Sequence, residues 1–328
     1  MHEEIHTIAN LVQHTRREFL RSALKWSAGA ALATAGYGGL FERSHVVVRR
    51  VEVLLDRLPE AFDGLTIAQL SDFHYHPYFS AGVIRRAVEL VRQMNPDVVA
   101  LTGDFVTVPE FRETDPEAAK ATVPCAELLA PLRPKLGLYA VLGNHDSYTD
   151  PGFVIEALGA HGIRVLQNEA IPVEREGHRV WIAGVNDVLA GFADLDVTLE
   201  RVPRTEAVML LAHEPDFADE AARYPVDLQL SGHSHGGQIR LPLLRPPMLP
   251  KLGRKYPRGL RTIGRTALYT NVGLGTIIVP IRILAAPEVT LLTLRVRRVV
   301  RSAEYCFPNT ELADPLRQAQ GRLSLRSG

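Results

Sequence analysis

Continuous apolar runs of strand length recur along the chain, and each ends where Asp, Asn or His begins. LTIAQL is followed by SDFHYH, PDVVALT by GDF, GLYAVL by GNHD, VWIAGV by ND, AVMLLA by HEPD, and VDLQL by SGHSH. A strand that is apolar at every position is typically covered on both faces. The pattern therefore predicts buried strands whose polar residues gather where the strands end.

Stretches with helical periodicity lie between several of these runs. Residues 81–95 place apolar side chains at helical spacing before Pro96, and residues 151–162 open with Pro151 and close with Gly162. The β-branched residues 46–55 predict a further strand. Strands that alternate with helices and carry polar residues at their ends are typical of an α/β fold with its chemistry at one edge of the sheet.

Composition excludes some classes of protein without selecting one. Of the 328 residues, 46% are hydrophobic and 23% charged, and the formal net charge is zero. Nothing in this overall charge suggests a nucleic-acid partner, so none is expected. Cys125 and Cys306 are the only cysteines, which excludes a structural zinc site made of thiolates and argues against a disulfide framework.

The first 41 residues have the pattern of an export signal. TRREFLR, from Thr15 to Arg21, precedes an uncharged segment rich in Ala and Gly that runs from Trp26 to Phe41. This pattern resembles a twin-arginine signal, which the export machinery for folded proteins reads; the alternative is the start of a basic amphipathic helix. The uncharged segment is shorter than the ~20 apolar residues of a membrane span, and the small residues 31–35 leave cleavage of the signal open.

The polar residues at the strand ends form one coherent set of ligand types. Taken singly, each has a structural alternative, such as a helix N-cap for Asp72 or a turn for Asn144. At consecutive strand ends, carboxylates, imidazoles and an amide together suit Mn, Fe, Zn or Co ions. Residues two apart in an extended segment point to the same face, as in Asp-x-His and His-x-His. The full set is Asp72, His74, Asp104, Asn144, His145, Asp146, His213, His233 and His235.

Five short segments resemble, in order, the five motifs of the calcineurin-like metallophosphoesterases: DFH, GDF, GNHD, AHEPD and GHSH, within residues 51–296. The resemblance implies that family's α/β (α+β) fold, a four-layer αββα sandwich, with two metal ions at the strand ends. By position, Asp104 bridges the two ions, since a shared carboxylate offsets the repulsion of cations ~3.5–4 Å apart. The implied shells are Asp72, His74 and His235 around one ion, and Asn144, His213 and His233 around the other.

The resemblance also implies a reaction, in which a hydroxide that bridges the metals attacks phosphorus. His145 then faces the substrate as general acid or as a stabiliser of charge, and Asp146 or Asp72 orients it; the alternative for His145 is a structural role. Purple acid phosphatases carry a metal-binding Tyr three residues after the bridging Asp. Thr107 stands at that position, so a purple iron centre is not expected.

Residues 232–287 contain no Asp or Glu and interleave cations with Leu, Met and Pro. One interpretation is a solvated, Pro-rich loop. The other is a cationic, apolar rim that binds an anionic lipid or an anionic membrane surface. The segment also resembles exported or membrane-associated phosphoesterases, some similar to UDP-2,3-diacylglucosamine pyrophosphatases. The expected rim residues are Arg240, Arg245, Lys251, Arg254, Lys255 and Arg282.

The sequence thus predicts a signal or anchor over residues 1–41, a phosphoesterase domain over 42–299 and a disordered tail over 300–328. The expected activity is metal-dependent hydrolysis of a phosphodiester, phosphomonoester or pyrophosphate bond in an anionic envelope lipid or nucleotide-lipid. The expected location is the outer face of the cytoplasmic membrane, the periplasm or the cell wall. The alternatives are a UDP-2,3-diacylglucosamine-type pyrophosphatase at the cytoplasmic face and a catalytically silent metal-binding scaffold.

Overall fold

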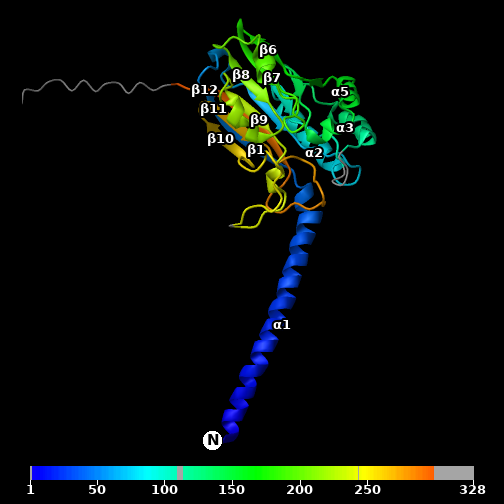
Figure 1. Ribbon diagram of the computed structural model, residues 1–328, viewed down its shortest axis with the longest axis vertical. Coiled ribbons are helices and arrows are strands. Elements are labelled where there is room, and N and C mark those ends of the chain that lie inside the picture. The colour runs from blue at the N-terminus through cyan, green and yellow to red at the C-terminus, as the bar shows by residue number, and fades with distance from the viewer. Residues whose placement is uncertain (1, 109–113, 243, 299–328) are drawn as a thin grey trace, which may run out of the picture. The chain divides into compact units, whose positions relative to one another are not determined.

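The computed structural model describes residues 2–108, 114–242 and 244–298, with the backbone alone for residues 2–15. Two six-stranded mixed sheets form the centre of the fold (Figure 1). The first has the order β1 (Val47–Leu55), β12 (Glu288–Val296), β2 (Thr66–Leu70), β3 (Val98–Leu101), β4 (Leu138–Ala140), β5 (Arg164–Val165). The second has the order β10 (Gly259–Ile263), β11 (Thr266–Thr270), β9 (Leu228–Ser231), β8 (Ala207–Leu211), β7 (His178–Gly184), β6 (Glu169–Arg175).

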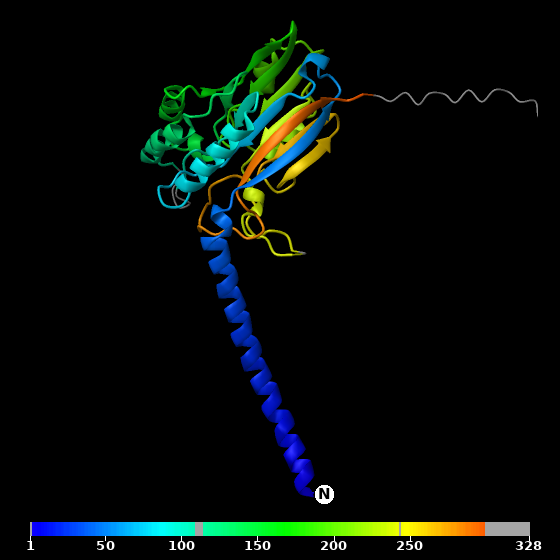
Figure 2. The same cartoon turned by 180° about the vertical axis from the view of Figure 1, so that it is seen from behind.

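Helices cover the outer face of each sheet, as both views show (Figure 2). The first sheet packs against α2 (Ala81–Met94), α3 (Thr122–Leu129) and α5 (Pro151–Gly159). The second packs against α6 (Leu195–Leu199) and α7 (Ala218–Ala221). The predicted four-layer αββα sandwich is therefore confirmed, and the helices expected within 81–95 and 151–162 are α2 and α5. Short elements in the connections are α4 (Asn144–Ser147) and the 3-10 turns η1 (Glu42–Ser44), η2 (Glu60–Phe62), η3 (Pro116–Ala121), η4 (Pro215–Phe217) and η5 (His235–Gly237).

The continuous apolar runs supply two cores at once. In β3, Val99 and Leu101 pack against the helices, whereas Val98 and Ala100 pack between the two sheets. The residues of β8 alternate in the same way between the core under α6 and α7 and the core between the sheets. Because both faces of these strands are buried, their sequences are apolar throughout instead of alternating with polar residues.

The N-terminal region forms a single helix, α1 (His2–Leu40), which includes the predicted signal. Several of its large apolar side chains are exposed, among them Trp26 at 80% and Leu40 at 81%. No helix in the described part of the chain combines the length and the apolarity needed to cross a membrane. The end of α1 contacts the domain, since Arg282 N donates a hydrogen bond to Gly38 O, and in η1, which follows, the Glu42 carboxylate accepts one from Ala285 N.

The chain divides into a unit of residues Met1–Arg297 and a second unit of residues Arg298–Gly328. All of the strands described above belong to the first unit. The prediction of a disordered tail over 300–328 concerns residues outside the described part of the chain.

Candidate active site

The polar residues predicted to converge come from the ends of neighbouring strands. Asp72 and His74 follow β2, Asp104 follows β3, and Asn144 opens α4 after β4; β2, β3 and β4 are parallel neighbours. His213 follows β8, and His233 and His235 follow β9, its parallel neighbour. Because the carboxyl ends of parallel strands lie at one edge of a sheet, each sheet presents its polar residues together.

Ligand atoms of these residues gather into groups whose members lie within 4.8 Å of one another. One group is Asp72, His74 and His235, and another is Asp104, His213 and His233. These groups bring together the carboxylates and histidines of each predicted shell, with Asp104 in the second; the buried amide oxygen of Asn144 has no hydrogen-bond partner among the described residues. A third group joins His74, Asp104 and His145, which places His145 beside the same atoms.

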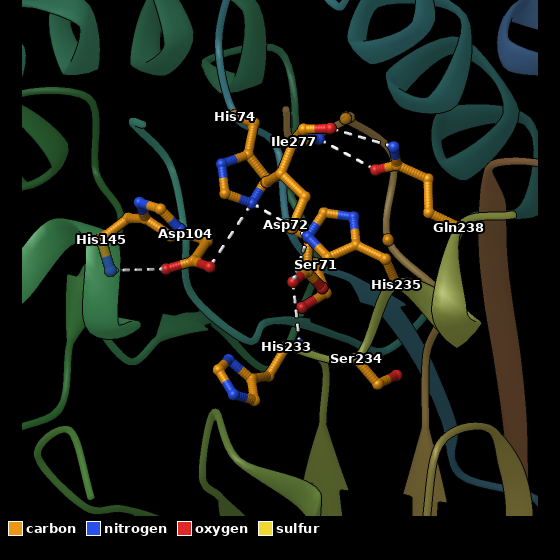
Figure 3. A network of polar contacts seen from close by, with 12 residues as sticks. Ser71, Asp72, His74, Asp104, His145, His233, Ser234, His235, Gln238 and Ile277 are labelled. Carbon is orange, nitrogen blue, oxygen red and sulfur yellow. Dashed lines mark hydrogen bonds and ion pairs between the residues drawn. The ribbon is translucent and has the colours of Figure 1, made fainter. Parts of the chain in front are cut away.

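The Asp104 carboxylate belongs to the second group and also contacts His74 of the first (Figure 3). Its Oδ2 is 3.4 Å from His74 Nε2 and 3.1 Å from His213 Nε2. Its Oδ1 accepts a hydrogen bond from the backbone N–H of His145 at 3.0 Å. One oxygen is thus held by the backbone, while the other faces a histidine of each group.

Second partners fix the orientation of three histidine rings. His213 Nδ1 donates to Thr102 O at 2.6 Å, and His233 Nε2 donates to Lys251 O at 2.8 Å. His74 Nδ1 is 2.9 Å from Thr107 Oγ1. Each bond leaves the other ring nitrogen free to face the site, which is the usual arrangement of metal-binding histidines. The sequence did not reveal these partners, because two of them are backbone carbonyls.

Several buried polar atoms at the site have no hydrogen-bond partner among the described residues. They are Asp72 Oδ2, Asn144 Oδ1 and His235 Nδ1. A buried polar atom without a partner costs free energy, so clustered examples indicate groups that bind a further species. Carboxylate, amide and imidazole donors suit a divalent transition metal, and the residues present therefore fit the metal ions that the motifs imply.

Two members of the cluster have pKa shifts that favour cation binding, whereas burial raises the pKa of Asp72 and the Asp104 carboxylate, against burial, raises that of His213. Burial disfavours the charge on Asp104, but His213 and His145 outweigh it and hold its pKa well below the usual value. Burial and then His74 lower the pKa of His235 well below its ordinary value. The carboxylate is therefore charged and that imidazole neutral, which are the states in which both groups bind metals.

The backbone at the site is held in an unusual conformation. Asp72, His74, Asp104, His233 and His235 all have positive φ, from 40° to 67°. This left-handed region is disfavoured for residues with a Cβ and costs on the order of 1–3 kcal/mol each. Such strain is typical of functional sites, where the surrounding fold imposes it so that the side chains point in one direction.

Two glycines of the motifs are required by close approach. A Cβ at Gly143 would lie 2.3 Å from Asp104 Oδ1, and one at Gly232 would lie 1.8 Å from Ser71 Oγ and 2.3 Å from Asp72 Oδ2. Both distances are far below van der Waals contact. The glycines of GNHD and GHSH therefore allow neighbouring segments to pack directly against the two carboxylates.

Asp146 was predicted to be a catalytic residue that orients His145, but its hydrogen-bond partners are backbone amides. Its fully buried carboxylate accepts four backbone hydrogen bonds, from the N–H groups of Asp104, Phe105, Val106 and Gly143. Burial and then the Asp104 charge raise its pKa to about 7, against the opposing effect of the Gly143 and Val106 N–H groups. Asp146 thus ties the GDF and GNHD turns together, and both of its oxygens are already engaged.

His145 is oriented by the backbone instead. Its Nδ1 accepts a hydrogen bond from Val108 N–H at 3.0 Å, so the proton of the neutral ring is on Nε2. Burial lowers the pKa of His145 to about 4, against the opposing effect of the Asp104 carboxylate. The prediction that Asp146 or Asp72 orients this ring is wrong, because the partner is an amide that sequence patterns do not identify.

The predicted cationic rim is only partly a free surface. Arg282 is wrongly placed there: it is fully buried and donates to Gly275 O, Val272 O and Ala285 O. Lys255 forms an ion pair with Asp219 at 2.7 Å. Lys251 meets the site through its carbonyl, which accepts from His233. The exposed or half-exposed side chains of Arg240, Arg245 and Arg254 complete the predicted set.

If Asp146 acts by positioning, D146N should lower the free energy of unfolding by about 1–3 kcal/mol for each donor left unpaired. Activity should fall with it, whereas the shape of the kcat–pH profile should not change. Urea denaturation and a pH series measure the two effects. D150N is the matched control, because Asp150 only caps α5 through Phe153 N–H, and Asn caps equally well. A stable D146N protein that has lost one limb of the profile would show proton transfer instead.

Comparison with known proteins agrees with this geometry. Residues 65–237 match the family described as calcineurin-like phosphoesterase. The chain is 35% identical over 286 residues to the Bacillus subtilis metallophosphoesterase YkuE. The matched region covers 86% of this chain and 98% of YkuE. It is 30% identical over 291 residues to the Escherichia coli phosphodiesterase YaeI, covering 85% and 99% of the two chains. A Danio rerio transmembrane protein with a metallophosphoesterase domain is 32% identical over 291 residues, 84% of this chain and 63% of that protein. The chain therefore belongs to the calcineurin-like phosphoesterases, which are metal-dependent phosphoester hydrolases.

Proposed function

We propose that the protein is a dinuclear phosphodiesterase that acts on an anionic lipid of the cell envelope. The observation that carries the dinuclear part is the position of Asp104 Oδ2, 3.4 Å from His74 Nε2 and 3.1 Å from His213 Nε2. A carboxylate oxygen that faces a histidine of each ligand group suits a pair of cations that share this ligand, since the shared anion offsets the repulsion between them.

Asp72, His74 and His235 would hold one ion, and Asn144, His213 and His233 the other, with Asp104 shared. Two such ions, when bound, supply Lewis acidity toward a phosphoryl oxygen and lower the pKa of bound water. Their identity among Mn, Fe, Zn and Co stays a prediction from the ligand types, because sites with nitrogen and oxygen ligands accept several of these ions.

The residues of the chain orient the substrate around that centre. His145 directs Nε2–H toward the site, since Val108 N–H occupies Nδ1. From there it donates a hydrogen bond to a phosphoryl oxygen or to the leaving oxygen, where negative charge develops. Asp146 holds the turns that carry Asp104 and His145 in register.

The N-terminal region supports a proposal for where the protein is located and for the class of its substrate. The pair Arg16 and Arg17 precedes an uncharged segment, and we propose that the twin-arginine machinery exports the folded protein. Exposed apolar residues of α1, such as Trp26 and Leu40, would then place the domain at an anionic membrane surface. A phosphodiester is favoured by the resemblance to a phosphodiesterase, and turnover of UDP-2,3-diacylglucosamine beside phospholipids tests the pyrophosphatase alternative.

Replacing the shared ligand should remove metal and activity together. In D104A, bound metal and hydrolysis of bis-p-nitrophenyl phosphate should both fall at least ~100-fold, because loss even of a group that only orients a ligand costs ~10–100-fold. Elemental analysis and a chromogenic assay measure the two quantities. D196A, at an exposed position of α6, is the matched control. Unchanged hydrolysis in D104A would refute the site, and retained metal without any hydrolysis in the unmodified protein would favour a silent scaffold.

His145 should matter for the reaction and not for the metals. H145A should lower kcat about 10²–10⁴-fold, the usual range for loss of a positioned proton donor, while metal content stays that of the unmodified protein. A parallel loss of metal would instead make His145 a ligand. H161A, at a half-buried histidine whose ring contacts Ala157 O, controls for histidine removal.

Export should depend on the arginine pair. Substitution of Lys for both Arg16 and Arg17 preserves their charge, so a merely basic helix start would be unaffected, whereas a twin-arginine signal should fail. Fractionation of cells that express the two forms measures the result. The double substitution R49K/R50K, in β1, serves as the matched control, and continued export of the Arg16/Arg17 variant would disprove the signal.

A further inference from the structure

A pocket of about 560 Å³ lies beside His74 and His145. Its lining residues come from five segments: residues 74–79, Thr107 with Val108, Ala118 and Ala121 of η3, His145, and residues 276–280. The volume falls within the ~300–1,000 Å³ of pockets that bind small molecules. None of the six residues predicted for the cationic rim lines this pocket.

The walls of the pocket are mainly apolar. Phe79, Val108, Ala118, Ala121 and the run Ile277–Pro280 line it, and no described lining residue is Asp, Glu, Asn, Gln, Lys or Arg. Two of its polar members are bonded within the wall itself, since His74 Nδ1 contacts Thr107 Oγ1 and His145 Nδ1 accepts from Val108 N–H. A sugar or a nucleobase edge would find few partners here, so its hydrogen bonds to water would be lost.

The wall formed by residues 276–280 is firmly held. The side chain of Gln238 accepts from Ile277 N–H at 2.9 Å and donates to Ile277 O and Val279 O at 2.9 and 3.0 Å. Buried Arg282 donates to Gly275 O and Val272 O, in the stretch that leads into this segment. Figure 3 shows Gln238 and Ile277 next to His235 and His74. Hydrogen bonds thus hold this wall of the pocket in place, and one of the residues that make them, Gln238, follows the candidate metal ligand His235 by three residues.

The pocket also adjoins the end of the N-terminal helix. A Cβ at Gly38 would lie 2.6 Å from Arg282 O and 2.9 Å from Ile281 Cγ2, and the Arg43 guanidinium lies 5.0 Å from the ring centre of Phe79. Exposed Leu40, Phe41 and Ile278 belong to these same segments. The end of α1, the segment proposed to contact the membrane, therefore lies next to the pocket wall, and both carry exposed apolar side chains.

We propose that this pocket binds a hydrocarbon chain of the substrate while the phosphoester lies at His74, Asp104 and His145. The proposal rests on the proposed function and specifies its substrate class, a phosphoester that carries an alkyl or acyl chain. Burial of a chain in an apolar, preformed pocket contributes about 0.8 kcal/mol per methylene, close to fourfold in affinity. The cationic rim would then contact the lipid headgroup or neighbouring anionic lipids instead of selecting the chain.

Binding of alkylphosphonates, which are not hydrolysed, tests the pocket directly on the metal-reconstituted full chain. Octylphosphonate should bind at least ~100-fold more tightly than methylphosphonate, since burial of four of its seven additional methylenes would already exceed that ratio. A118F, which fills the pocket, should reduce this preference about tenfold or more. A121L is a second, smaller filling change in case A118F does not fold. A160F, at an exposed position at the end of α5, is the matched control and should keep the preference. Calorimetry measures all four proteins.

Equal affinity for the two phosphonates, or a preference that survives both filling variants, overturns the pocket proposal whatever the enzyme hydrolyses. Failure of the proposed function is a separate observation, namely no turnover of any phosphodiester by a protein that binds metal. Hydrolysis of dihexanoyl phosphatidylglycerol monomers and of long-chain phosphatidylglycerol in vesicles then separates two sources of the chain. Turnover of the vesicle lipid supports entry from the membrane, and turnover of monomers alone supports the same pocket with a soluble lipid.

Discussion

The site depends on the burial of two carboxylates that form no ion pair with a described Lys or Arg. Asp72 and Asp104 are 0% and 1% exposed, and in the described part of the chain they form ion pairs only with histidines. A buried anion without compensation is strongly unfavourable. Histidines compensate only when protonated; burial acts against that state, but at His213 the Asp104 carboxylate outweighs it and raises the pKa well above the ordinary value. Metal ions resolve the conflict, because they accept the carboxylates and neutral imidazoles together.

The fold supplies this arrangement through its sheet edges and through strained turns. Parallel strands bring Asp72, Asp104 and Asn144 to one edge and His213 and His233 to another, and the core between the sheets holds the two edges together. The positive φ values of the ligand residues then aim their side chains inward. Turns in this strained conformation persist only when surrounding contacts impose it. The four backbone hydrogen bonds accepted by the Asp146 carboxylate are some of these contacts.

Much of this architecture could be predicted from the sequence. Apolar runs such as PDVVALT are continuous because both faces of the strand are buried, and the polar residues after them mark the strand ends. What could not be predicted depends on contacts between distant segments. In the sequence, Arg282 belongs to the same acid-free, arginine-rich segment as exposed arginines such as Arg245. In the structure, however, its guanidinium donates hydrogen bonds to buried backbone carbonyls. Asp146 belongs to a catalytic motif, but its neighbours are backbone amides, which carry no sequence signature. The apolar pocket draws on residues as far apart as Phe79 and Pro280, so no local pattern indicates it.

The segment SGHSHGGQ illustrates how one short stretch can serve both metal and substrate. His233 and His235 face different ligand groups, and their backbone must turn within a few residues, at φ 67° and 50°. Three residues later, Gln238 bonds the segment that forms the pocket wall. A shift of this stretch would therefore move two metal ligands and the pocket wall together. Apolar packing is not directional, so packing alone would let the wall segment shift relative to the metal ligands. The hydrogen bonds of buried polar side chains are directional and therefore fix the position of the wall.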